Sequence, residues 1–403
     1  MNVTSIISEI GNNNSIYPLM LRDCGIENPV KVYISRKENL KESKIMAQDA
    51  TRERFIDEYA TSAVWLGGIP AVEYAASKII KKKGYNSNIS IKLFKKEAEQ
   101  NIEGNIRKFK NLAPEAVKEL EKVKANKKTF EKLIACKFAA AIIIPTALMG
   151  FVLPKLNFAL TKRIKDDRKK SNRQKANNKQ VSFGQGFTAS ITNLNTVNKM
   201  AITDLGLTVG RVSTSRNEEE GYTNGFKMIG SMLINYVTPK YIARGLDAIA
   251  NKIFKINVNL DPLVLDSKKF IEAVKENSFE LPKSDSAKDM LEFLDTKPKS
   301  LFAQFAQKSG KVSYLKNGIR DPRKYVDIED LTKFKNEFET FIKSAKQSGN
   351  LEKFAKKAKF VKSANIVSNV VLSSLLLAFA LPKAQYQFIK LITGKYSDPG
   401  LKD

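Results

Sequence analysis

Two long apolar runs stand out in a chain that elsewhere alternates polar and apolar positions. Residues 138–154 carry no charged side chain, and neither do residues 363–382. As α-helices, with a rise of 1.5 Å per residue, the runs would be about 25 Å and about 30 Å long, close to the ~30 Å thickness of the hydrocarbon core of a bilayer. The pattern therefore predicts two helices that associate with a membrane.

The same runs could instead be core helices of a soluble protein. A helix that is apolar on every side can be buried inside a large domain. The polar residues of the second run fit both interpretations, because Ser and Asn side chains also hydrogen-bond between helices in lipid. These residues are Asn365, Ser368, Asn369, Ser373 and Ser374.

The two runs also resemble each other. Residues 141–162 and 369–390, aligned without gaps, are identical at six of 22 positions, among them a shared Leu-Pro-Lys. An internal duplication would explain this match. Chance similarity between apolar helices of low diversity would explain it equally well. In both cases we expect the proline to end or bend each helix at a membrane surface, with the lysine reaching water.

Shorter apolar segments that contain a proline precede each run, at 59–80 and 226–254. Within the later charged part, residues 327–349 predict an amphipathic helix, with Asp327 as its N-terminal cap and Gly349 at its end. The predicted organisation is an N-terminal polar region (1–58), a first helical unit (59–161) with apolar helix 138–154, a basic linker (162–225), a second helical unit (226–392) with a soluble helical insert (255–360) and apolar helix 363–382, and a tail (393–403).

The charge balance indicates a polyanionic partner. The chain contains 69 Lys and Arg against 42 Asp and Glu, for a formal net charge of +27. Anionic lipid surfaces, nucleic acids and acidic proteins all attract such a charge. Lipid is favoured because basic residues cluster beside the apolar runs, and the cluster at 162–180 lacks the aromatic residues that would stack on bases. The residues expected to contact lipid headgroups or another polyanion are Lys155, Lys162, Arg163, Lys165, Arg168, Lys169, Lys170, Arg173, Lys383 and Lys390.

Candidate catalytic chemistry is sparse. The chain has no histidine and only two cysteines, Cys24 and Cys136, so we write no His-dependent catalytic pair, zinc site or disulfide framework. Gly184–Ala189 with Asp204 fits the spacing of a dinucleotide-binding fingerprint, but no strand or βαβ unit is predicted around it. We therefore expect a non-enzymatic protein without a cofactor or metal. The N-terminus also lacks the pattern of a secretory signal peptide.

Three segments carry a resemblance to other proteins: WLGGIP at 65–70, LPKLNFALTK at 153–162 and VSFGQ at 181–185. They are similar to segments of uncharacterised, Lys-rich predicted membrane proteins from AT-rich gut bacteria. The resemblance implies a location, the bacterial inner membrane, and no activity.

The sequence thus predicts a mainly α-helical, membrane-associated protein with two long apolar helices and a soluble helical domain. The expected function is that of a scaffold or membrane-remodelling protein at an anionic lipid surface. Two alternatives remain: a soluble basic protein that binds nucleic acid, and a small transporter built from a duplicated unit. Whether the protein forms homo-oligomers is left open.

Overall fold

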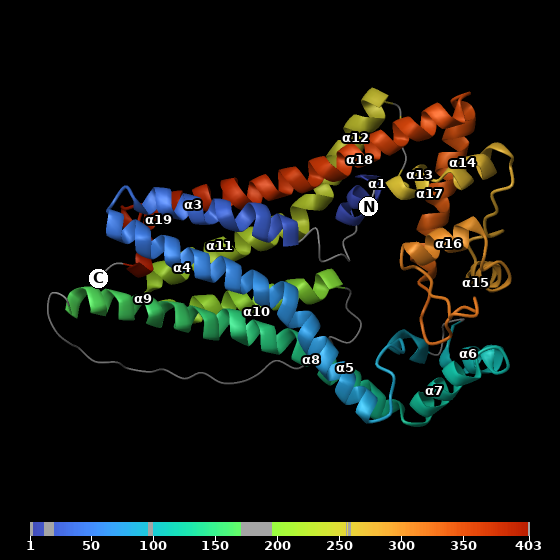
Figure 1. The fold of residues 1–403 in the computed structure, drawn as a ribbon, viewed down its shortest axis with the longest axis horizontal. Helices are drawn as coiled ribbons and strands as arrows, with labels where there is room; N and C mark the ends of the chain where they lie inside the picture. Colours follow the sequence, from blue (N-terminus) through green and yellow to red (C-terminus); the bar gives the residue numbers. More distant parts are fainter. Residues whose placement is uncertain are drawn as a thin grey trace. The chain divides into compact units, whose positions relative to one another are not determined.

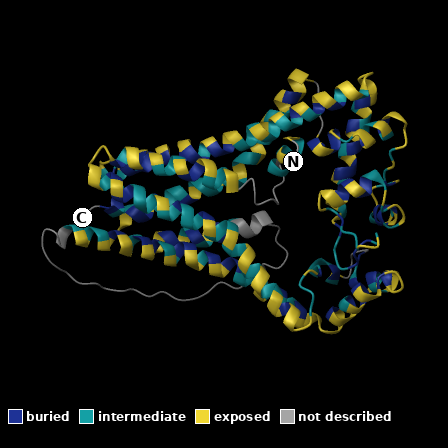
Figure 2. Cartoon of the chain, in the orientation of Figure 1, coloured by how far each residue is buried: buried dark blue, intermediate teal, exposed yellow. Residues whose placement is uncertain are grey.

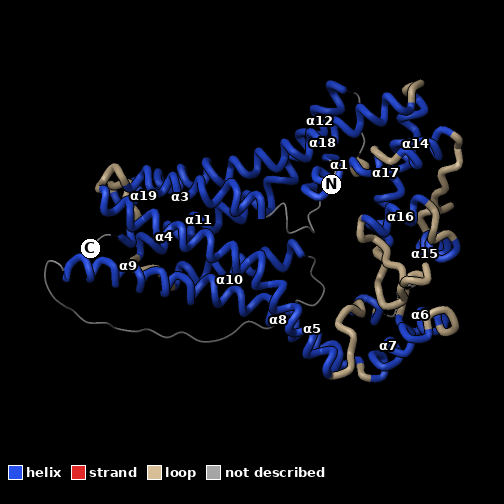
Figure 3. The backbone as a smooth tube through the Cα atoms, in the orientation of Figure 1, coloured by secondary structure: helices blue, strands red, loops and turns tan. Residues whose placement is uncertain are grey.

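The chain is mainly α-helical, as predicted. The computed structural model describes residues 3–11, 20–95, 100–170, 196–254, 256 and 259–401. Within these ranges no β-strand is present (Figure 3), and one isolated antiparallel bridge joins Tyr314 to Arg320. Cys24 and Cys136 are both free.

The chain folds into two units, each assembled from three separate stretches. Unit 1 consists of residues 1–13, 77–135 and 243–368, and unit 2 of residues 14–76, 136–242 and 369–403. The predicted sequential domains, 59–161 and 226–392, each run through both units. The reason is that four long helices begin in one unit and end in the other, namely α5 (Ile69–Lys82), α8 (Lys127–Ala147), α12 (Thr238–Phe254) and α18 (Leu351–Leu375).

Unit 1 is built around an aromatic core. The rings of Phe270, Phe302, Phe338 and Phe341 are fully buried and lie within one hydrophobic cluster. Helix α17 forms as predicted, because the carboxylate of Asp327 accepts a hydrogen bond from the backbone N–H of Asp330 at its start. Besides parts of the four shared helices, the helical segments of unit 1 are α1 (Val3–Gly11), η3 (Ile91–Phe94), α6 (Ile102–Phe109), α7 (Pro114–Ala125), α13 (Pro262–Leu265), α14 (Lys268–Lys275), α15 (Ala287–Thr296), α16 (Leu301–Lys308) and α17 (Ile328–Gln347).

Unit 2 is a helical bundle in which α3 packs on α4, α10 on α11, α4 on α9, and α11 on α19 (Figure 1). The label η marks a short π or 3₁₀ segment. Besides parts of the shared helices, the segments of unit 2 are η1 (Leu21–Glu27), α3 (Asn28–Asn39), α4 (Lys44–Ala63), η2 (Val64–Gly68), η4 (Leu148–Val152), α9 (Leu153–Lys170), α10 (Thr196–Ser213), α11 (Glu218–Met232), η5 (Leu233–Val237), η6 (Leu376–Ala380), α19 (Leu381–Thr393) and η7 (Pro399–Leu401).

Five helical segments of unit 2 share one irregularity, a π turn that ends two residues before a proline. The prolines are Pro29, Pro70, Pro154, Pro239 and Pro382, after η1, η2, η4, η5 and η6. In each case the residue before the proline donates its N–H to the carbonyl five residues back. Proline lacks an N–H and its ring clashes with the carbonyl four residues back, and the wider π turn relieves this clash.

These π turns correct the expectation for Leu-Pro-Lys. The prolines at 154 and 382 do not end their helices, because the chain continues helically to Lys170 and to Thr393. The resulting continuous helical stretches, Lys127–Arg168 and Leu351–Thr393, are both long and apolar enough to span a membrane, by length and composition.

The predicted basic linker, 162–225, is largely helical where it is described. Helix α9 extends to Lys170, and α10 and the start of α11 occupy much of the remainder. The glycines of α10 allow it to pack closely on η4. A Cβ atom built on Gly210 would lie 2.8 Å from the Cα of Gly150, and one on Gly206 would lie 2.7 Å from a methyl carbon of Thr146. Since 206 faces 146 and 210 faces 150, α10 runs parallel to the α8–η4–α9 helix.

Candidate functional site: a buried ion-pair network in unit 2

The described part of unit 2 contains a network of charged side chains centred on α4. The carboxylate of Glu58, which is buried, lies 2.7 Å from the ammonium of Lys227 on α11. The ammonium of Lys31 on α3 lies 3.4 Å from the other oxygen of Glu58, and the Arg54 guanidinium lies 3.3 Å from the first. Glu58 therefore joins three helices through its two oxygens.

Asp57, the neighbour of Glu58, pairs with cationic side chains from the second half of the chain. Its carboxylate accepts a hydrogen bond of 2.7 Å from Nη1 of Arg211 on α10, whose Nη2 donates to Thr61 at 2.8 Å. Lys227 lies 3.3 Å from the same carboxylate. The side chain of Arg211 is almost fully buried, so its charge depends on Asp57 for compensation.

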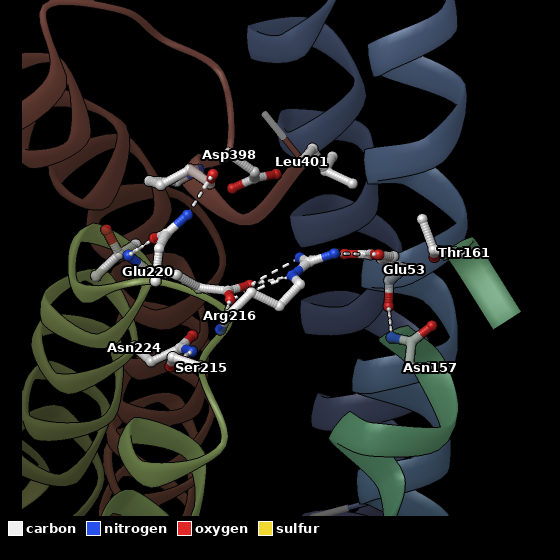
Figure 4. Close-up of polar contacts among 12 residues, drawn as sticks. Glu53, Asn157, Thr161, Ser215, Arg216, Glu220, Asn224, Asp398 and Leu401 are labelled. Atoms are coloured by element: carbon white, nitrogen blue, oxygen red, sulfur yellow. Dashed lines mark hydrogen bonds and ion pairs between the residues drawn. The ribbon is translucent and has the colours of Figure 1, made fainter. Parts of the chain in front are cut away.

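Arg216 forms a second centre, in the connection between α10 and α11 (Figure 4). Its two terminal nitrogens each lie 2.9 Å from an oxygen of Glu53 on α4, and Nη2 also donates to Glu220 on α11 at 2.7 Å. Its guanidinium carbon is 4.1 Å from the ring centroid of Phe158 on α9. Bidentate pairing combined with a cation–π contact holds a guanidinium in one orientation.

The C-terminal segment closes the network. The hydroxyl of the buried Tyr386 donates to Asp398 at 3.0 Å, and the amide of Asn39 donates to the same carboxylate oxygen at 3.0 Å. The backbone N–H of Asp398 in turn donates to the side-chain oxygen of Asn39 at 3.0 Å. These bonds attach residues near 398 to α3 and α19.

Burial and neighbouring charges act in opposite directions on the charged groups of the network. Burial alone would raise the pKa of Glu58, but Lys227, Lys31 and Arg54 outweigh burial and hold the pKa well below its usual range. For Glu53, burial is the largest influence and raises the pKa despite the pairing with Arg216. Burial also lowers the pKa of the Lys227 ammonium, although Glu58 and Asp57 raise it. The Glu58 carboxylate is therefore the group that its neighbours stabilise most clearly in the charged form.

A small cavity of about 70 Å³ lies within this network, and residues of α4, α9, α11 and α19 line it. Two of its polar atoms, Oδ1 of Asn157 and Nε of Arg211, are buried without a hydrogen-bond partner among the described residues. The volume suits about two water molecules, at ~30 Å³ each. The arrangement is suited to holding water and fixing helices, since the neighbouring charges already neutralise one another.

Metal binding and the dinucleotide fingerprint gain no support. Within the described ranges, no group of three or more Cys, Asp or Glu side chains is arranged to hold a metal ion. Gly184–Ala189 lies outside the described residues. Asp204 is buried on α10, where the Tyr236 hydroxyl donates to it at 2.6 Å.

The residues predicted to contact headgroups differ in exposure and in their contacts with the chain. Lys155, Arg163 and Lys383 are exposed. Others contact the protein itself: Arg168 pairs with Asp49, Lys165 donates to the carbonyl of Leu401, and Lys390 donates to the hydroxyl of Tyr396. Lys162 is exposed and has an interaction within the chain. The backbone of Lys169 and Lys170 is helical, and Arg173 lies outside the described residues.

The network itself was missed at the level of sequence, where residues 1–58 were expected to be only a polar region. A signal was present. Glu53 and Asp57, like Arg54 and Glu58, are four residues apart, so the four charges occupy adjacent positions on successive turns just before an apolar segment. This spacing places the charges on one face of a helix, and the structure shows that Glu58 on this face is buried.

Comparison of the chain with known protein families, curated proteins and solved structures finds no match. The fold and the network must therefore be interpreted from their own geometry.

Proposed function

We propose that this is a non-enzymatic, membrane-associated scaffold that inserts the apolar surface of unit 2 into an anionic membrane. One observation carries the proposal: the apolar runs turn large side chains outward. Ile143 is 53% exposed, Val371 47% and Leu375 45%. Other helices of the unit do the same, for example Val209 on α10 and Leu233 on η5. Contact of these apolar side chains with lipid costs no free energy, whereas their exposure to water does.

The soluble-core interpretation accounts poorly for the same side chains. A core helix buries most of its surface, but only 28% of the most apolar window of each long helix is buried. Lysines directly after two of the prolines, Lys155 and Lys383, are exposed next to these windows. They could pair with anionic headgroups, and each cation near such a surface contributes about 1 kcal/mol.

An internal duplication forms part of the proposal and is supported by the packing of unit 2. Helix α4 packs on α9 as α11 packs on α19, and α10 packs on η4 as α3 packs on η6. Asn157 and Gln385, which are 228 positions apart, are both buried amides. Four of the five π turns, those before Pro70, Pro154, Pro239 and Pro382, fit the same origin as two equivalent pairs.

The direction of α10 argues against the transporter alternative. Helix α9 continues 20 residues beyond Gly150, and α10 begins 14 residues before Gly210, which faces Gly150. The end of α9 and the start of α10 are therefore about 50 Å apart along the bundle. If both helices crossed a bilayer, residues 171–195 would have to return across it. These residues are rich in Asn, Gln, Ser and Lys, a composition unsuited to lipid.

Membrane fractionation tests the proposal. The full chain should remain in the membrane pellet after high-salt and alkaline carbonate washes, because its attachment is mainly apolar. Replacing Lys155, Arg163 and Lys383 with Gln should weaken binding to vesicles that contain phosphatidylglycerol and leave binding to neutral vesicles unchanged. Complete release by salt would reject the proposal in favour of a soluble polyanion-binding protein.

A further inference from the structure

Unit 2 also has an apolar groove of about 420 Å³ along the α18–η6–α19 helix, bordered on the other side by Ile242 of α12. Its walls include Ile242, Leu372, Leu376 and Phe379. Lys383 is the one charged residue among those that line it. Leu372 and Phe379 are each at least 40% exposed, so the groove opens outward.

Ala380 is the smallest of the residues that line the groove. It is the last residue of η6 and lies about one helical turn after Leu376 and one turn before Lys383. The residue 228 positions earlier, at the end of η4, is Val152, and the lysine that corresponds to Lys383 is Lys155. The first half of the chain thus supplies a natural comparison, with the same lysine but a bulkier residue in place of Ala380.

The chemistry of the groove selects its occupant. An open apolar groove along a helix fits a flexible hydrocarbon chain, and the ammonium of Lys383, the last of the lining residues along this helix, fits a phosphate. A second copy of this protein is a poor occupant, because two chains with a net charge of +27 repel each other. We propose that the groove binds one acyl chain of an anionic phospholipid, with the phosphate at Lys383. This inference rests on the proposed function and adds a defined lipid site to it.

Native mass spectrometry of the full chain in detergent tests the site, with palmitoyl-oleoyl phosphatidylglycerol and phosphatidylcholine as probes. The wild type should retain one phosphatidylglycerol in preference to phosphatidylcholine. Ala380→Leu, which fills the groove, should remove the retention of both lipids. Lys383→Gln should lower the preference for phosphatidylglycerol by about fivefold, the ratio expected for one lysine near an anionic group.

Matched variants in the first half provide the control. Val152→Leu and Lys155→Gln should leave the retained lipid unchanged. Equal retention of the two lipids by the wild type, unchanged retention by Ala380→Leu, or a lipid-free dimer that Ala380→Leu dissociates would each overturn the assignment. Vesicle flotation of the same variants separates the two proposals: if the chain floats but retains no lipid, the groove proposal fails alone, and if the wild type does not float, the membrane proposal fails.

Discussion

The two units of this protein distribute their side chains in opposite ways. Unit 1 buries phenyl rings, and Phe270 and Phe338 belong to a large hydrophobic cluster there. Unit 2 buries Glu58 and Arg211 and exposes leucines and valines. Figure 2 shows exposed residues along the helices of the bundle that contains the C-terminus. Most of the buried polar residues, and most of the exposed large apolar ones, belong to unit 2.

Under the membrane proposal, this difference reflects two different surroundings. In water, the removal of apolar surface is the main force that drives folding, and the packed rings of unit 1 supply it. In lipid, apolar side chains gain nothing by being buried, so helices are held together by close packing, hydrogen bonds and paired charges. Unit 2 has these features in the glycine contact of α10 with η4 and in the network around Glu58.

The largest effect should come from removing one charge of the network. Glu58→Gln would remove the carboxylate charge that pairs with Lys31 and Lys227. Breaking a buried ion pair typically lowers the free energy of unfolding by about 3–5 kcal/mol. Trp65 is the only tryptophan and lies in η2 of unit 2, so its fluorescence during urea unfolding reports on this unit.

The exposed pair of Glu329 and Lys333 in unit 1 provides the control. With the unfolding of both variants followed by circular dichroism at 222 nm, which reports on the helices of both units, Glu329→Gln should change the free energy of unfolding by less than about 1 kcal/mol. Equal losses in the two variants would mean that the network of unit 2 is no more important than a surface ion pair.

A loss of similar or slightly smaller size is expected in unit 1 from Phe338→Ala. The ring is fully buried and lies 5.0 Å from that of Phe334 and 5.4 Å from that of Phe270, measured between centroids. Truncation of a buried phenylalanine costs about 3–5 kcal/mol. Circular dichroism at 222 nm should show the loss. Leu375→Ala, at an exposed position of unit 2, should be nearly neutral in detergent, and a large loss there would indicate a conventional core.

A smaller effect should follow from Gly210→Ala. The added methyl group would meet the backbone of Gly150 at about 3 Å, and overpacking of this kind costs about 1–3 kcal/mol. At Gly245 a Cβ atom would meet nothing within 4 Å, so Gly245→Ala should stabilise its helix by up to about 1 kcal/mol. Thermal unfolding of the two variants should therefore shift in opposite directions, and a common direction would refute the close contact.

The last effect depends on pH. Burial raises the pKa of Asp204 to about 6, against the hydrogen bonds from Tyr236 and Trp65. Asp23 nearby also raises this pKa, and Arg22 lowers it. Since the unfolded value is about 4, the stability that protonated Asp204 contributes is complete below about pH 4 and is lost as the pH rises through 6.

Asp204→Asn should therefore stabilise unit 2 at pH 8, by at most about 3 kcal/mol, and have no effect at pH 4. Urea unfolding followed by Trp65 fluorescence at both pH values measures the difference. A stabilisation that is the same at both pH values would show that Asp204 does not titrate in this range.

Much of the fold could be predicted from local sequence signals. The helix 328–347 follows from the cap at Asp327 and its apolar stripe, and both apolar runs are helical. The continuation of the helices through Pro154 and Pro382 could not be predicted, because it depends on π turns that no simple residue pattern specifies. The division into units was equally hidden, since long helices belong to both.

The candidate site could not be predicted from local sequence patterns, for a different reason. The partners of α4 lie far away in the chain: Arg211 is 154 positions from Asp57, and Lys227 is 169 positions from Glu58. Charge spacing within α4 could identify a charged face, but it could not identify the cations that neutralise this face. The exposed lysines at 155 and 383 were within reach, because they directly follow apolar runs.

The most direct test determines whether lipid or water surrounds the exposed apolar side chains of unit 2. Single cysteines replace Leu148, Leu375 or, as a control, Lys343 in a Cys24→Ser, Cys136→Ser background, and each carries a spin label. The spin labels report collisions with oxygen and with a water-soluble nickel chelate. With the protein bound to phosphatidylglycerol vesicles, labels at 148 and 375 should collide with oxygen and be protected from nickel, and the label at 343 should show the reverse. Free access of nickel at 148 and 375 would contradict the account.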